Sequence, residues 1–83
     1  MKKLAKPQRR ILLAAELYRR EHGHGPLWRE LRAQLGLPKT AFALRVQALR
    51  QQGLLTYADN EPRSLRVTPE GLAAAANASA RRR

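Results

Sequence analysis

Residues 27–53 read LWRELRAQLGLPKTAFALRVQALRQQG, and this stretch decides the fold. Its first part predicts a short helix, because Leu31 and Leu35 lie four residues apart and therefore share one helix face. Gly36 follows directly and is typical of a helix end, since glycine adopts the left-handed backbone that closes a helix without steric cost. The stretch therefore begins with a short helix and a tight turn.

A second helix follows this turn. Its apolar face consists of Phe42, Val46 and Leu49, spaced four and then three residues apart, and Gly53 ends it. A helix, a glycine turn and a second helix form a helix-turn-helix, the motif that places its second helix in the major groove of DNA. With Phe42, Val46 and Leu49 facing inward, the opposite face of this helix is left for contact with a partner.

The residues after the motif predict a β-hairpin and another helix. An apolar run at residues 54–58 and an alternating run at residues 65–67 flank the polar, turn-rich residues 59–64. Thr68 then has the residue type of an N-cap, and Pro69 suits the first helical turn. A hairpin placed directly after a helix-turn-helix is the wing of a winged helix.

The residues before the motif predict a longer helix over residues 7–21, starting at Pro7. We expect Tyr18 to pack at the rim of the core. The apolar stripe of this helix is Ile11, Ala14, Ala15 and Tyr18, widened by Leu12, Leu13 and Leu17.

The break at residues 22–26 contains two histidines, His22 and His24. A structural zinc site needs four ligands, and the chain has no other histidine and no cysteine. We therefore expect a glycine turn here, with no metal and no cofactor.

The 83 residues have room for one small domain. We predict an α+β winged helix-turn-helix, with a three-helix core, a β-hairpin wing and a short C-terminal helix. The expected organisation is a basic arm at residues 1–6, the domain at residues 7–76 and a basic disordered tail at residues 77–83. No apolar run is long enough to cross a membrane, and we expect a cytoplasmic, nucleoid-associated protein.

The charge distribution points to a polyanionic partner. The net charge is +11, and residues 31–58 contain no acid at all. Solubility is ordinarily served by mixed charges, so a field of one sign over the motif favours nucleic acid. The basic side chains within that stretch are Arg32, Lys39, Arg45 and Arg50. No nucleophile–base set, phosphate-binding loop or carboxylate cluster indicates an enzyme.

Several side chains are suited to contact duplex DNA. Gln47 can form paired hydrogen bonds with adenine, and Arg45 can do so with guanine. Trp28 either packs across the loop or contacts the DNA backbone, and we favour packing. The wing arginines are expected to contact phosphates, while the acids at the wing's turn argue against deep insertion of its tip. The full set of candidate DNA contacts is Trp28, Arg29, Lys39, Thr40, Ala43, Leu44, Arg45, Gln47, Arg63 and Arg66.

Two groups of residues carry a family resemblance. The first group resembles the N-terminal DNA-binding domain of LexA-type repressors: Leu4, Gln8, Ile11-Leu12, Ala14-Ala15, Gly23, Pro26, Glu30-Leu31, Leu35-Gly36, Ala48-Leu49 and Gly53-Leu54. The second, LPKTAFALRVQALRQQGLL at residues 37–55 and VTPEG at residues 67–71, is similar to winged-helix regulators in general, MarR-like ones included. The resemblance covers residues 4–72 and implies a winged helix that binds duplex DNA through its second motif helix. There is no room for the self-cleaving domain of LexA-type repressors, so induced cleavage is not expected.

Three functions remain open from the sequence. The leading one is a small stand-alone, repressor-like transcription regulator that reads a duplex sequence, from a phage or another mobile element, with a homodimer on DNA as a further hypothesis. The second is an architectural, replication or recombination accessory protein of low sequence preference. The third is a winged-helix module that binds a protein partner through Leu44, whose apolar side chain is placed outward.

Overall fold

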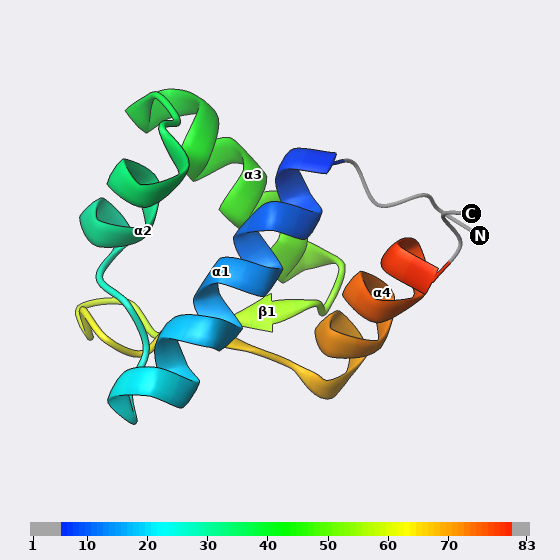
Figure 1. The fold of residues 1–83 in the computed structure, drawn as a ribbon. Coiled ribbons are helices and arrows are strands. Elements are labelled where there is room, and N and C mark those ends of the chain that lie inside the picture. Colours follow the sequence, from blue (N-terminus) through cyan, green and yellow to red (C-terminus); the bar gives the residue numbers. More distant parts are fainter. Residues whose placement is uncertain (1–5, 81–83) are drawn as a thin grey trace.

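The structure of the chain is a computed structural model that describes residues 6–80. It is an α+β arrangement of helices with a two-stranded antiparallel sheet, as predicted. Helix α1 crosses the middle of the molecule and packs against α2, α3, α4 and β2 (Figure 1). The elements follow in the order α1 (Lys6–His22), α2 (Trp28–Leu35), α3 (Lys39–Gln51), β1 (Leu55–Thr56), β2 (Arg66–Val67) and α4 (Pro69–Ala80).

The turn between α2 and α3 forms where the sequence predicts it. Gly36 has a φ of 70°, the left-handed conformation that glycine favours. Its backbone N–H donates to the carbonyl of Arg32 at 2.9 Å, and the N–H of Leu37 donates to the same carbonyl at 3.2 Å. These bonds satisfy the end of α2 and let α3 begin at Lys39, three residues later.

The inward face of α3 is confirmed. Phe42 is 1% exposed, and Val46 and Leu49 are fully buried. They meet the buried side of α1 and the leucines of the hairpin, so one core holds the helices and the wing together. The other buried apolar members of this core are Ile11, Leu12, Ala15, Leu31, Leu55, Leu65 and Ala75.

The predicted apolar stripe of α1 is partly wrong. Leu13 and Leu17 are 43% and 52% exposed, whereas Glu16 is buried. At about 100° per residue, the two leucines fall on the side of α1 opposite the buried Ile11 and Leu12. Burial of Glu16 is offset by charge-assisted hydrogen bonds at 2.9 Å from each of two arginines of the same helix, Arg19 and Arg20. The bond from Arg19, more than any other contact, lowers the pKa of Glu16.

The hairpin has shorter strands than the apolar runs suggest. Only two pairs form, Leu55 with Val67 and Thr56 with Arg66. Beyond them Ser64 organises the loop: its hydroxyl accepts a hydrogen bond from the N–H of Ala58 at 2.8 Å and donates to the carbonyl of Glu61 at 2.8 Å. These side-chain bonds replace further strand pairing, which a pattern of apolar residues cannot reveal.

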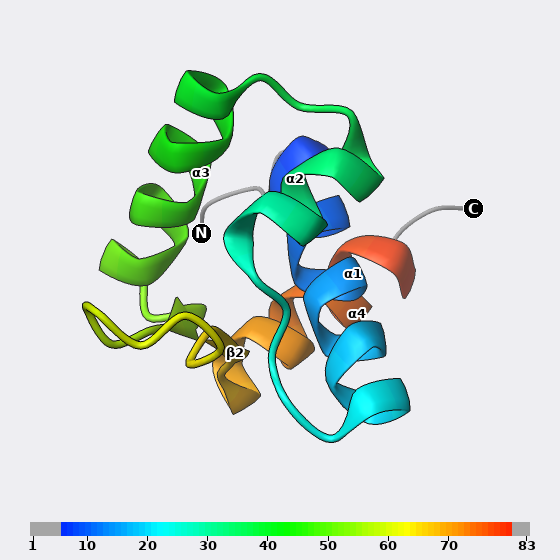
Figure 2. The ribbon, with the colours of Figure 1, turned by 90° about the vertical axis from the view of Figure 1, so that its left-hand side faces the viewer.

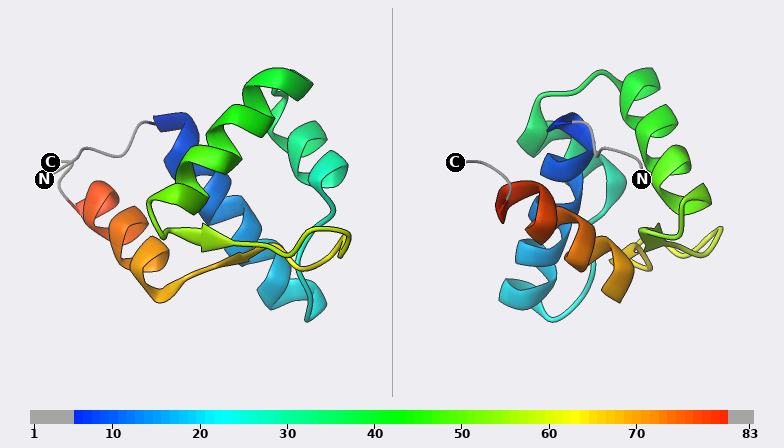
Figure 3. Two further views of the ribbon diagram at one scale, coloured as in Figure 1. Left: turned by 180° about the vertical axis from the view of Figure 1, so that it is seen from behind. Right: turned by 90° about the vertical axis from the view of Figure 1, so that its right-hand side faces the viewer.

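The predicted start of α4 is confirmed. Thr68 is its N-cap, with Oγ1 accepting from the N–H of Gly71 at 3.0 Å. The same hydroxyl donates to the carbonyl of Gly53 at 2.6 Å, which ties α4 to the end of α3. In Figure 3, α4 lies beside α1, away from α2.

The C-terminal boundary expected at residue 76 is four residues short, because α4 runs on to Ala80. Nearly all of the predicted basic arm and the arginines of the predicted tail lie outside the described residues.

Gly71→Ala is expected to lower the free energy of unfolding by about 1–3 kcal/mol. A Cβ at this position would overlap the carbonyl oxygen of Leu54 and approach a methyl group of Val67. This overlap outweighs the gain of about 1 kcal/mol in helix propensity. Urea denaturation followed by circular dichroism measures the change. Glu70→Ala, one residue earlier and exposed, is the control; equal stability of the two variants would contradict the close approach.

Candidate nucleic-acid interface

The outward face of α3 is open to solvent. Thr40, Leu44, Gln47 and Gln51 are all exposed, and Ala43 lies half-buried at the edge of this face. Figure 2 shows α3 along one side of the molecule, with no other described element on its outer side (Figure 2). The predicted face therefore exists, and it combines two amides and a hydroxyl with one large apolar side chain.

Arg45 lies closer to the core than the sequence suggests. It is half-buried, and its Nε is shielded from solvent with no hydrogen-bond partner. At about 100° per residue, Arg45 is only about 60° from Phe42, so its stem follows the buried side of α3. Gln47 is thus the more accessible of the two predicted base-reading residues.

Three of the four exposed cations among the predicted contacts carry charges that no acid of residues 6–80 neutralises. Arg29 is in the first turn of α2, Lys39 is the first residue of α3, and Arg66 lies on β2 opposite Thr56. Within residues 6–80, none of the three forms an ion pair. Their charges are therefore available to an external anion.

Arg63 lies in the wing, as predicted, but it makes contacts within the chain that the sequence does not predict. Its guanidinium is directed towards the junction of α1 and α2, where Nη1 donates to the Tyr18 hydroxyl at 3.1 Å and the Gly25 carbonyl at 3.2 Å. Nη1 and Nη2 also donate to the two carboxylate oxygens of Glu30, each at 3.2 Å. A phosphate contact would require these bonds to break, so we assign Arg63 to holding the wing in place.

Glu30 is the partner that fixes this arrangement. Its carboxylate accepts the backbone N–H of Leu27 at 3.0 Å, which is one half of a capping box at the start of α2. The bond from Leu27 and then the bond from Arg63 lower the pKa of Glu30 to about 2. Glu30 therefore joins three parts of the chain: the loop before α2, α2 itself and the base of the wing.

Glu30→Gln is expected to lose stability at neutral pH but much less in acid. The charged form is favoured in the folded state, so its contribution is complete above the ordinary pKa of 4.5 and is lost as the pH falls towards about 2. The difference in melting temperature between wild type and Glu30→Gln should therefore shrink between pH 5 and pH 3. Thermal melts across this range measure it, and a difference that grows in acid would contradict the assignment.

An aromatic chain connects α2, α3 and the wing. Trp28 packs edge-on against Phe42, with ring centroids 5.8 Å apart, and edge-on against Tyr57, with centroids 5.0 Å apart. The packing interpretation of Trp28 is therefore supported. Tyr57, the last ring of this series, is in turn covered by Arg50, whose Cζ lies 4.2 Å from the ring centroid.

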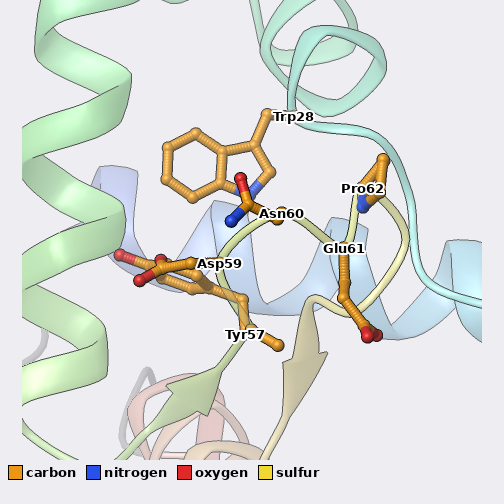
Figure 4. Close-up of a pocket in the computed structure, with 7 residues that line it drawn as sticks. Trp28, Tyr57, Asp59, Asn60, Glu61 and Pro62 are labelled. Atoms are coloured by element: carbon orange, nitrogen blue, oxygen red, sulfur yellow. The ribbon is translucent and has the colours of Figure 1, made fainter.

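Trp28 and Tyr57 also line an open cleft of about 340 Å³, together with the wing loop at residues 58–62. The close-up shows the side chains of Asp59 and Asn60 from the wing loop lining this cleft together with Trp28 and Tyr57 (Figure 4). Tyr57 and Arg50 are not among the contacts predicted from the sequence, because they meet only once β1 packs against the end of α3.

Comparison with known proteins places the chain among DNA-binding domains. The family model described as LexA DNA binding domain matches residues 1–64. The search of curated proteins found no match. Among solved structures, the fold is similar to the crystal structure of the PcaV transcriptional regulator from Streptomyces coelicolor in complex with its natural ligand. The TM-score is 0.76 and the identity 24%, with 96% of this chain and 56% of that chain covered.

These matches confirm the predicted winged helix-turn-helix. The likeness to PcaV concerns the fold, and the matching family is one of DNA-binding domains rather than of enzymes. Across residues 6–80, none of the helices has the length and apolar character needed to cross a lipid bilayer.

Proposed function

The chain belongs to the family of LexA DNA-binding domains, and on that premise we propose that it is a sequence-specific, repressor-like regulator of transcription. The observation that carries the proposal is the outward face of α3, which is exposed and free of acids and begins at Lys39, a cation without an ion pair within residues 6–80. Such a face fits the major groove, where an α-helix can reach base edges. Bound at a promoter, a domain of this size would repress by occupying the site.

Each exposed side chain of this face has a matching role. Gln47 carries a donor and an acceptor and can read adenine, while Leu44 can contact a thymine methyl group. Thr40, near the start of the helix, can reach a base or a phosphate. The cations Arg29, Lys39 and Arg66 would contact phosphates, which position the helix without reading sequence.

Selection of bound duplexes from a random pool tests this proposal, and it also reports whether the site is a palindrome read by a homodimer. We expect a defined sequence to emerge. On that sequence, Gln47→Ala should cost about 1–3 kcal/mol of binding free energy and relax one base position, with scrambled duplexes much less affected. Gln34→Ala, which removes an exposed glutamine from α2, is the matched control.

Two outcomes of the random-pool experiment would contradict base reading by α3. If no sequence emerges, or if Gln47→Ala weakens selected and scrambled duplexes equally, α3 does not read bases. The low-specificity architectural or accessory function then replaces the regulator.

One observation favours a second candidate function. Leu44 is 62% exposed in the middle of the outward face of α3, and a large apolar side chain there also suits a protein partner. A partner that the protein captures after nuclease treatment, and that Leu44→Ser releases, would support this function. Leu17→Ser, at a leucine 52% exposed on α1, is the control for the loss of an apolar surface group.

A further inference from the structure

Arg50 differs from the other cations of α3 because one face of its guanidinium packs on an aromatic ring, that of Tyr57. It is exposed in the last turn of the helix, and its Cζ lies 4.2 Å from the centre of the Tyr57 ring. A guanidinium over a ring uses its flat face for the cation–π contact. Its N–H groups lie around the edge, and in Arg50 they remain available for hydrogen bonds.

The Tyr57 ring on which Arg50 packs is itself connected to the hydrophobic core. Tyr57 meets Trp28 at an interplanar angle of 90°, and Trp28 meets Phe42 at 74°. Phe42 itself is 1% exposed. This chain of ring contacts fixes the position of Tyr57 relative to α3, and therefore the place where the guanidinium of Arg50 rests.

Arg50 differs from Arg63 in that its N–H groups are not engaged by other residues in 6–80. The edge of the Arg63 guanidinium is occupied by Glu30, Tyr18 and a backbone carbonyl. Arg50 has no ion pair within residues 6–80, although Asp59 lines the same cleft as Tyr57. Arg50 thus combines a fixed position with an unused hydrogen-bonding edge.

We propose that Arg50 binds a DNA phosphate between α3 and the wing, and that Tyr57 is the residue that positions it. This inference rests on the proposed binding of duplex DNA through α3. With α3 in the major groove and the wing beside it, the sugar–phosphate backbone that separates two grooves passes between them, where Arg50 lies. Because the stacked side chain is already ordered, it loses less rotamer freedom on binding than an unrestrained arginine.

The test measures binding to a mixed-sequence duplex over a range of salt concentrations. The slope of log K against log salt is negative, and Arg50→Ala should reduce its magnitude by about 0.9 for every sequence. Tyr57→Leu should leave that slope unchanged and weaken binding about two- to fivefold, the usual value of an exposed cation–π contact. Tyr57→Phe keeps the ring and should bind like the wild type. Arg10→Ala, on the face of α1 turned away from the core, is the charge control.

A double variant separates positioning from general stability. If Tyr57 acts through Arg50, Tyr57→Leu should weaken binding no further once Arg50 is alanine. Thermal melts ensure that each variant is folded at the assay temperature. Losses that multiply in the double variant, or an effect of Arg50→Ala no larger than that of Arg10→Ala, would overturn the inference. Failure of the wild type to bind duplex DNA would instead overturn the proposed function.

Discussion

Phe42→Ala is expected to lower the free energy of unfolding by about 3–5 kcal/mol, enough to unfold much of a domain of this size. The ring is 1% exposed and contacts the edge of Trp28, so truncation leaves a cavity at the point where α2, α3 and the wing meet. Urea denaturation, followed by circular dichroism and by the fluorescence of the single tryptophan, measures the loss.

The control for this experiment is Leu44→Ala in the same helix. Leu44 is 62% exposed, so the same kind of truncation should change stability by no more than about 0.5 kcal/mol. If Phe42→Ala were as stable as Leu44→Ala, the inward and outward faces of α3 would have to be exchanged, and the assignment of the DNA-binding face would change with them.

Duplex binding is expected to weaken steeply as salt is added. Four exposed cations are the proposed phosphate contacts: Arg29, Lys39, Arg50 and Arg66. If each neutralises one phosphate, the slope of log K against log salt is about −3.6, and a fourfold rise in salt lowers affinity about 150-fold. Fluorescence anisotropy with a labelled duplex measures the slope, and an affinity that does not change with salt would exclude phosphate-dominated binding.

The two wing arginines give an internal comparison. Arg66→Ala should reduce the salt slope by about one. Arg63→Ala should leave the slope nearly unchanged and lower the melting temperature, because it removes the partner of Glu30. A loss of slope in Arg63→Ala would mean that Arg63 leaves Glu30 when DNA binds.

Helix positions were predictable because they depend on local signals. The glycine after α2, the spacing of Phe42, Val46 and Leu49, and the Thr68 cap each act within a few residues of chain. The outward face of α3 follows from the same periodicity. On α1 the pattern misled, because seven apolar positions are more than one helix face can bury, and periodicity alone did not say which of them face out.

The roles of the arginines were not predictable from local signals. Arg63 and Glu30 are 33 residues apart in sequence and meet only because the hairpin folds back onto the start of α2. Arg50 and Tyr57 meet at a different place, where the chain reverses after α3 and β1 packs against that helix. Charge composition identifies a basic surface, but tertiary contacts decide which cations are already engaged and which remain available to DNA.

The bonds of Arg63 limit how this protein could be re-engineered. With only two residue pairs in its ladder, the hairpin is held by its buried Leu55 and Leu65 and by the bonds of Arg63 to Glu30 and Tyr18. A chimera that exchanged residues 55–67 for the hairpin of another regulator would leave Glu30 and Tyr18 without their partner. The exchangeable unit is therefore discontinuous, and a graft that keeps the new wing in place must also replace the residues at positions 18 and 30.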